Sequence, residues 1–435
     1  MSSQLFRVAC VSTLIAAAVA CATAAEEGGL APRADLGDGG TSLPDAAPMN
    51  DAPAIPALDA APPTCSDAGW CITSLPDPDL TLLDVWPLSN HAFAIAISDR
   101  GTQLIEWSSG TGHWSYVLDD ALPGGATSSP QSQLWSPNEN EVYFAFWDLA
   151  ALSGEGIVRG YVNHGKRPLP PETVWSWTRH RFDCDSFDLM PRVWGSSADD
   201  VYVAFCKTIH RSRSGDGDAG ADSGTSPWIP DYVDDDPANA IAFKGVTGTG
   251  DDDVWFVGDR GWGACAVVIR KTPTGYRTIV DGVPEPGGSC GAKNGLPTIS
   301  RAFSAWSALA NGRLVGVLGD RGSIDTELVR VAAGVDGDHT VDTISRSSAM
   351  PVTFAAVWGE SEDDLWILGR RDFGVDWRGL VARGTNIWND GGSFQYSTLV
   401  LNGAPNFYDL YSIRGTSNNN LWAVGVDRAL HKASP

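Results

Sequence analysis

The sequence predicts an all-β protein, a seven-bladed β-propeller whose ring is closed by an N-terminal strand that joins the C-terminal blade. Three observations favour this fold. A tryptophan-marked segment recurs seven times along the chain, about 54 residues apart. A nearly continuous apolar run follows each copy, and the last copy ends one strand short of the others. Repeats that cannot bury their apolar faces alone indicate an architecture in which neighbouring units stack.

The repeat predicts antiparallel strands that are buried on both faces. Four copies align without gaps, at residues 193–202, 246–255, 357–366 and 413–422, and three weaker copies contain Trp86, Trp135 and Trp306. In the clearer copies a turn rich in Ser, Asp and Asn leads into an apolar strand such as Val254–Gly258. Continuous rather than alternating hydrophobicity indicates that both sheet faces are covered, as in the stacked four-stranded blades of a propeller.

The chain ends predict how the ring closes. The last repeat stops after residues 429–432, which complete three strands. The missing outer strand is expected from Gly69–Pro76, because this segment resembles the outer-strand segment His113–Val117 of the first full repeat. Closing one blade from both termini removes an exposed sheet edge that would otherwise promote aggregation.

The N-terminus predicts export. Residues 1–20 are expected to be a signal peptide, because Arg7 precedes an apolar run, Val8–Ala20, that is too short to span a hydrocarbon core about 30 Å thick. Residues 18–21 (AVAC) match a relaxed bacterial lipobox, which predicts a lipid on Cys21 and an anchor in a membrane. Ordinary cleavage near residues 22–25 is the alternative.

Residues 21–63 are expected to form a disordered tether, and residues 64–435 the β-propeller domain. Ala, Pro, Gly and Asp make up 26 of the 36 residues between 28 and 63. Such a segment cannot bury enough apolar surface to offset its ordering entropy. A tether after a lipidated cysteine would hold the domain off a membrane.

Charge and cysteine content constrain the partner and the compartment. The chain has 53 acidic and 30 basic side chains and a net charge of −23. No nucleic-acid partner is expected, because such binding depends on neutralising phosphates with Lys and Arg. Six cysteines lie in the propeller region and allow fifteen pairings, of which pairing between neighbours in sequence is the most economical. It would give disulfides Cys65–Cys71, Cys184–Cys206 and Cys265–Cys290 in an oxidising compartment.

No motif assigns catalytic residues, and no cofactor is expected. The seven histidines are scattered, and no HExxH, GxSxG or P-loop pattern occurs. Asp216, Asp218 and Asp222 are weak metal candidates, because they space acidic oxygens as calcium loops do. The alternative is a solvated loop, since they lie in a Gly, Ser and Asp-rich stretch that lacks a distal Glu.

The other conspicuous residues have structural interpretations. The repeat tryptophans are expected to pack between blades, and Asp234–Asp236 and Asp251–Asp253 to lie in solvated turns. Binding residues concentrate on loops held by a rigid scaffold. The variable loops are therefore the candidates for a partner site, and the longest of them are expected at residues 148–180, 207–240 and 370–408.

The repeat pattern W-G-x-S-x-x-D-[VL]-[WY]-x-V-G resembles that of exported bacterial β-propeller proteins, often lipoproteins, which are loosely grouped with BNR/Asp-box-like propellers. Trp194-Gly195 and Trp358-Gly359 match the pattern, whereas Val246-Thr247 and Ser89-Asn90 depart from it. The resemblance covers about residues 65–435 and implies an outer-membrane or cell-surface lipoprotein. A periplasmic or secreted soluble protein is the alternative.

The function expected is a binding or interaction scaffold, tethered to a membrane at the cell envelope, whose partner is a protein or a glycan. The alternative is a propeller glycoside hydrolase or lyase with carboxylates in its central channel, as acid–base chemistry would require. Propeller folds host both classes, so the residues around the axis decide between them.

Overall fold

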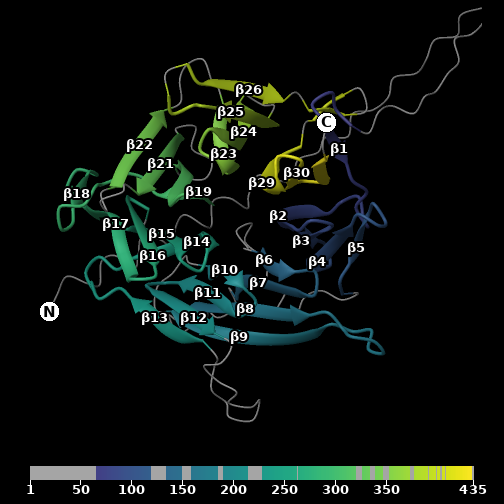
Figure 1. Cartoon of the computed structure of the whole chain (residues 1–435), viewed down its shortest axis with the longest axis horizontal. Coiled ribbons are helices and arrows are strands. Elements are labelled where there is room, and N and C mark those ends of the chain that lie inside the picture. The colour runs from purple at the N-terminus through teal and green to yellow at the C-terminus, as the bar shows by residue number, and fades with distance from the viewer. Residues whose placement is uncertain are drawn as a thin grey trace, which may run out of the picture. The chain divides into compact units, whose positions relative to one another are not determined.

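The structure, a computed structural model, consists of β-sheets arranged around a common axis (Figure 1). It describes residues 65–118, 134–148, 158–184, 190–213, 228–261, 263–319, 326–333, 339–345, 352–372, 377–389, 391–397, 399–401, 404–406 and 408–433. Every secondary-structure element assigned within these residues is a β-strand. The expected signal peptide, Cys21, the tether, and Asp216, Asp218 and Asp222 lie outside the described residues.

Each blade starts with an inner strand next to the axis and adds strands outwards. Blade 1 contains β2 (Thr81–Pro87), β3 (His91–Ser98), β4 (Gly101–Ser108) and β5 (Trp114–Tyr116). Blade 2 contains β6 (Leu134–Asn138), β7 (Glu141–Asp148), β8 (Val158–Lys166) and β9 (Ser176–Cys184). Blade 3 contains β10 (Arg192–Ser197), β11 (Asp200–Phe205), β12 (Thr208–Arg213) and β13 (Ile229–Val233).

Blade 4 has a fifth strand. It contains β14 (Ala242–Gly250), β15 (Asp253–Arg260), β16 (Cys265–Thr272), β17 (Gly275–Pro284) and β18 (Cys290–Ala292). Blade 5 contains β19 (Phe303–Leu309), β20 (Arg313–Leu318), β21 (Glu327–Ala333) and β22 (His339–Ser345). Blade 6 contains β23 (Val352–Ser361), β24 (Asp364–Asp372), β25 (Trp377–Thr385) and β26 (Ser393–Ser397), followed by a hairpin of β27 (Val400–Leu401) and β28 (Ala404–Pro405).

Blade 7 is built from both ends of the propeller. It contains β29 (Leu410–Ser417), β30 (Asn420–Gly425) and β31 (Arg428–Ala433), and β1 (Trp70–Ile72) is its outer strand. β1 runs antiparallel to β31, with Trp70 opposite Lys432. Trp70 is fully buried, and its ring meets Trp366 of blade 6 edge-on at a centroid distance of 5.8 Å. This arrangement confirms the predicted closure by an N-terminal strand.

The inner strands form a closed ring around the axis, as Figure 1 shows. Each one contacts the inner strands of both neighbouring blades, and β2 of blade 1 contacts β29 of blade 7. The seven blades therefore match the seven predicted repeats. Because every blade is covered by a neighbour on each face, its second strand is apolar without alternation. In β11 (DVYVAF) all six residues are buried.

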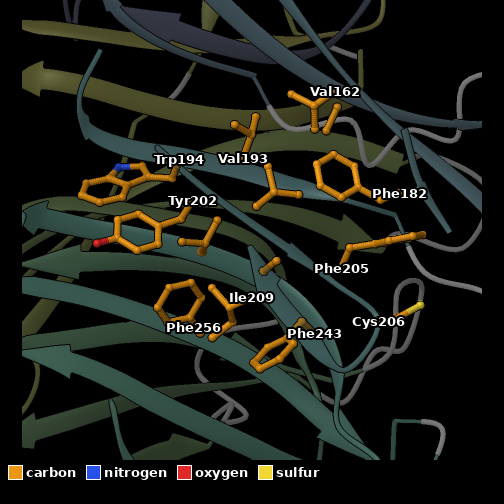
Figure 2. Close-up of a cluster of buried hydrophobic side chains, with 14 of the residues drawn as sticks. Val162, Phe182, Val193, Trp194, Tyr202, Phe205, Cys206, Ile209, Phe243 and Phe256 are labelled. Carbon is orange, nitrogen blue, oxygen red and sulfur yellow. The ribbon is translucent and has the colours of Figure 1, made fainter. Parts of the chain in front are cut away.

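The hydrophobic core lies between the blades. Its largest cluster joins blades 2, 3 and 4, and Figure 2 shows part of it. Tyr202 and Phe243 both meet the ring of Phe256, at centroid distances of 5.8 Å and 6.3 Å. Edge-to-face pairs of this kind add about 1 kcal/mol each to the free energy gained by burying the rings.

Repeat tryptophans on the inner strands pack against glycines of the next blade. Trp194 covers Gly248, and an added Cβ at this glycine would overlap the indole. Trp135 covers Gly195 in the same way, and Trp358 approaches Gly415. In blade 3 the Trp194-Gly195 dipeptide thus contributes to two inter-blade contacts, because its indole packs on Gly248 of blade 4 and its glycine receives Trp135 of blade 2.

Three disulfides link the six described cysteines. They are Cys65–Cys71, Cys184–Cys206 and Cys265–Cys290, the pairing expected from the sequence. The first fixes the segment before the closing strand, the second ties β9 of blade 2 to the end of β11 in blade 3, and the third holds β18 to β16. Such bonds are typical of proteins in an oxidising, extracellular type of compartment.

Candidate binding site at the propeller axis

Five of the seven inner strands have a β-bulge at the equivalent position of the strand. In blades 1, 4, 5, 6 and 7 the pairing of the inner strand with the next strand shifts by one residue, which sets one extra residue in the inner strand. The extra residues are Leu83, Lys244, Ser304, Ala355 and Tyr411. A bulge bends its strand and re-aims the side chains beside it. The residues that follow the bulges, such as Asp84, Gly245 and Ser412, therefore occupy equivalent positions in their blades.

The charges on the inner strands differ in sign from those of the whole chain. Among the described residues the inner strands carry three cations, Arg192, Lys244 and Arg414, and two carboxylates, Asp84 and Glu360. The chain as a whole has a net charge of −23. The axis is therefore lined by a slightly cationic set of residues within a strongly acidic protein.

Both inner-strand carboxylates are held by neighbouring blades. Asp84 is buried, and its Oδ1 accepts hydrogen bonds from Ser412 Oγ at 2.8 Å and from Arg414 Nε at 3.2 Å, both in blade 7. Its Oδ2 accepts one from the backbone N–H of Leu134 in blade 2 at 3.1 Å. Glu360 accepts two hydrogen bonds from Asn418, each at 2.8 Å. The two side chains join blades and are not aimed jointly at a common point.

Arg414 occupies the position that tryptophan holds in other repeats. Its guanidinium carbon lies 5.0 Å from the ring centroid of Trp86 in blade 1, and its Nε donates to Asp84. The side chain is 27% exposed. Its Nη1 and Nη2 make no hydrogen bond or ion pair with any residue that the structure describes. Stacking and one ion pair therefore fix the plane of the guanidinium and leave its outer edge available.

A second cation and an aromatic ring lie across blades 3, 4 and 5. The indole of Trp306 lies against Gly245, and its centroid is 6.0 Å from the guanidinium carbon of Arg192. Lys244, next to Gly245, lies 3.6 Å from Asp259 and is one-quarter exposed. The attraction between a cation and an aromatic ring is stronger at a partly desolvated site than at an exposed one. The half-buried rings Trp86, Trp306, Trp358 and Tyr411 give the inner strands an aromatic as well as a cationic character.

Five blades carry a repeated triad of side chains on their second and third strands, at the end next to the turn that joins the first two strands. An acid or amide opens the second strand, an aromatic ring follows two residues later, and a cation or histidine stands opposite that ring on the third strand. The polar contacts measure 2.5–3.2 Å and the ring contacts 4.0–5.5 Å. The triads are Glu141–Tyr143–His164, Asp200–Tyr202–Arg211, Asp253–Trp255–Arg270, Asp364–Trp366–Arg383 and Asn420–Trp422–His431.

These triads correct one expectation from the sequence. Asp253 does not lie in a merely solvated turn, because it accepts a hydrogen bond from Arg270 Nε at 2.8 Å. In blade 3 burial opposes ionisation of Asp200, but Arg211 outweighs it and lowers the pKa of this carboxyl below its ordinary value. The D-x-[WY] pattern marks the first two residues of the triad in the sequence. The cation opposite the ring is identified only from the pairing of the strands.

A buried ionic network at the other end of blade 4 corrects a second expectation. Arg260 is 2% exposed, and its Nε donates to Asp281 Oδ1 at 2.7 Å. Its Nη1 donates to Asp234 Oδ2 at 3.0 Å. Asp234 is therefore buried between blades 3 and 4 rather than solvated. Asp236 pairs with Lys293 Nζ at 2.7 Å, and this hydrogen bond lowers the pKa of Asp236 to about 2.

Several histidines are half-buried between strands in neutral form. Burial lowers the pKa of His210 and of His431 to about 4. The pKa of His164 is also lowered to about 4, because burial outweighs the attraction of Glu141. His164 stacks on Tyr143 at 4.0 Å, and His431 stacks on Trp422 at 4.1 Å. These rings pack as aromatic surfaces within the blades.

The three variable segments hold the exposed apolar side chains. The large hydrophobic residues that are exposed in the described part of the chain all fall in segments 148–180, 207–240 and 370–408. They are Leu169, Val174, Ile229, Val233, Tyr396, Val400 and Tyr408. The expectation that these segments are long loops was wrong, because they contain strand residues of β8, β9, β12, β13, β25 and β26. Within the described residues, no three His, Cys, Asp or Glu side chains are grouped as metal ligands. No helix suited to crossing a membrane is found among them.

Comparisons with known proteins identify the fold. No protein-family model and no curated protein matches the chain. Among solved structures, YCF48 bound to a D1 peptide has a TM-score of 0.51 and 13% sequence identity, covering 86% of this chain and 100% of that one. YCF48 from Cyanidioschyzon merolae has the same TM-score and identity, covering 84% of this chain and 99% of that one. At this level of identity the likeness shows a shared fold, and the chain is a seven-bladed β-propeller.

Proposed function

We propose that the protein is an exported binding scaffold, held at the cell envelope by a lipid on Cys21, whose propeller binds a protein partner through the residues around its axis. The single observation that carries the proposal is the state of the inner-strand carboxylates. Asp84 and Glu360 are each hydrogen-bonded to neighbouring blades, while the side chains of Arg414 and Lys244 are each about one-quarter exposed. This favours recognition over acid–base hydrolysis, which requires a carboxylate free to exchange a proton.

Two further observations support a protein partner. Aromatic and arginine side chains dominate the binding energy of protein interfaces. The similar structure of YCF48 carries a bound D1 peptide, which makes a peptide ligand reasonable for a propeller of this design. The disulfides support an extracytoplasmic setting, since such bonds persist in oxidising compartments.

The binding proposal is tested by presenting the purified chain with a displayed library of random peptides and, separately, with a glycan array. We expect selected peptides to bind at micromolar concentration, no glycan to bind above background, and no chromogenic glycoside to be hydrolysed. Glycan binding without peptide binding, or turnover of a glycoside, would refute it.

The anchor is tested by growing the organism with a clickable palmitate. We expect the protein to be labelled and the label to be lost in Cys21→Ala. Cys10→Ala is the matched control, because Cys10 lies inside the apolar run of the signal peptide and should keep the label. Unlabelled wild-type protein would instead support ordinary cleavage and release.

A further inference from the structure

We infer that Arg414 is the anchor for one carboxylate of the bound partner, presented by a peptide segment that is otherwise apolar. The inference rests on the proposed function and deepens it by naming the chemical group that the axis recognises. It starts from a substitution within the repeat. Where blades 1, 2, 3 and 6 have Trp86, Trp135, Trp194 and Trp358, blade 7 has Arg414.

The surroundings of Arg414 orient it for recognition. Trp86 supports one face of the guanidinium at 5.0 Å, and Asp84 accepts from Nε at 3.2 Å. Hydrogen bonds from Ser412 and Leu134 hold the carboxylate of Asp84 in place, so that it also restrains Arg414 Nε. The two Nη groups remain without a partner among the described residues. These parallel donors match the two oxygens of a carboxylate, which is the geometry of bidentate arginine recognition.

The apolar character of the ligand follows from Trp86, the ring that stacks on Arg414, and from the hydrophobic cluster against which this ring packs. Trp86, Leu88 and Tyr411 are half-buried and pack against one hydrophobic cluster of blades 1 and 2. Asn420 of blade 7 donates to the carbonyl of Leu88 at 2.9 Å, which holds the end of β2 against blade 7. A carboxylate bound here would therefore lie beside aromatic and aliphatic side chains. Its flanking residues gain by burying apolar surface.

The charge of the whole protein limits the ligand to a single negative group. A polyanion would be repelled by a chain of net charge −23, whereas one carboxylate carries little of this penalty. A peptide carboxyl terminus and a single Asp or Glu side chain both supply the group. A guanidinium held by stacking also loses less conformational entropy on binding than a free one.

The experiment measures binding of three rhodamine-labelled hexapeptides to the full chain by fluorescence anisotropy. One is apolar with a free carboxyl terminus, the second is its terminal amide, and the third is the amide with one central glutamate. We expect the first or the third to bind at least tenfold more tightly than the second. Which of the two does so distinguishes a chain terminus from an acidic side chain.

Variants assign the effect to Arg414. Arg414→Gln should abolish the preference for the carboxylate, and Arg414→Lys should retain only part of it, because an ammonium cannot form the bidentate pair. Arg428→Gln is the matched control. Arg428 also stacks on an aromatic ring, Tyr408 at 4.0 Å, but lies on β31 outside the ring of inner strands. This control should bind all three peptides as the unaltered protein does.

A measurement on the unaltered protein covers the case in which Arg414→Gln fails to fold. Phenylglyoxal modification of Arg414, read by mass spectrometry, should be slowed at least fivefold by the carboxylate peptide and not by the amide. Equal binding of all three peptides, or an unchanged preference in Arg414→Gln, overturns the inference but leaves peptide binding intact. If none of the three peptides binds although library-selected peptides do, the inference is likewise overturned and peptide binding is left intact. If no peptide of any kind binds, the proposed function falls as well.

Discussion

The indole of Trp306 lies where a side chain at Gly245 of the preceding blade would otherwise stand. At the level of Gly245, blades 3, 5 and 6 have Arg192, Ala305 and Ala356. The indole of Trp306 occupies the space that a side chain at position 245 would need, so glycine is the residue that fits there. The two residues form one packing unit that links blades 4 and 5 at the axis.

This unit predicts strongly non-additive mutational effects. Gly245→Ala places a methyl group inside the indole and should lower the free energy of unfolding by about 1–3 kcal/mol. In a Trp306→Ala background the same methyl group finds space and should cost much less. A double-mutant cycle by urea denaturation measures the difference. Gly250→Ala is the control, because an added Cβ there meets nothing within 4 Å. Additive costs would contradict the contact.

The closing strand predicts that the whole ring depends on Trp70. Trp70→Ala removes a fully buried indole from the junction of blades 6 and 7 and should cost about 3–5 kcal/mol. Deletion of residues 64–78 should abolish the cooperative thermal transition, since β29–β31 would be left with an open edge. Circular dichroism of both variants checks this. Tyr396→Ala, at an exposed ring on β26, should melt as the unaltered protein does. An unchanged melt after the deletion would refute closure by β1.

The buried network at Arg260 predicts a large cost for losing one charge. Arg260→Met leaves Asp234 and Asp281 buried without their partner and should destabilise the protein by about 3–5 kcal/mol. The sequence provides a matched control. Arg100 lies in the same Asp-Arg-Gly tripeptide of blade 1, but its side chain is 65% exposed. Arg100→Met should change stability by less than about 0.5 kcal/mol. Similar effects of the two substitutions in chemical denaturation would disprove the network.

The half-buried histidines predict a loss of stability in mild acid. The pKa of His431 is about 4 in the folded state and 6.5 as its ordinary value, so the unfolded chain binds a proton first as pH falls. The stabilisation is complete above pH 6.5 and is lost as pH falls from 6.5 towards 4. His164 and His210 act in the same direction.

Melting temperatures measured from pH 7.5 to 4 should therefore fall, with most of the decrease below pH 6.5. His431→Gln should lower stability at pH 7.5 and flatten the decrease. His113→Gln replaces an exposed imidazole and serves as the control. A melting temperature that is independent of pH down to pH 4.5 would show that these imidazoles are not buried as described.

The blade count, the closure and the disulfide pairs were predictable because each has a local signal. The Trp-Gly motif, the three-strand ending and the spacing of Cys184 and Cys206 can all be read along the chain. The assignment of Trp306 as a repeat tryptophan was wrong. In the paired strands Ser307, opposite Val315, takes the position that Trp194 takes opposite Tyr202. A shift of one residue moves a side chain to the other face of its strand, and sequence alone does not reveal it.

The candidate site was less predictable, because its residues meet only through the ring. Arg414 and Asp84 are 330 residues apart in the chain and 3.2 Å apart in the structure. The substitution of Arg for Trp in the last repeat was visible, but its meaning depends on Trp86 of the first blade. The Asp-Arg-Gly tripeptide shows the same limit, since it buries Arg260 and exposes Arg100.

The central claim, that a protein partner binds at the propeller axis, is tested most directly by photo-crosslinking. A library-selected peptide carrying a benzophenone side chain is irradiated with the full chain, and the attachment points are mapped by mass spectrometry. The account predicts attachment to β2 and β29, near Trp86, Leu88 and Tyr411. Attachment confined to the exposed apolar residues of the outer segments, such as Leu169, Ile229 and Tyr396, would contradict it.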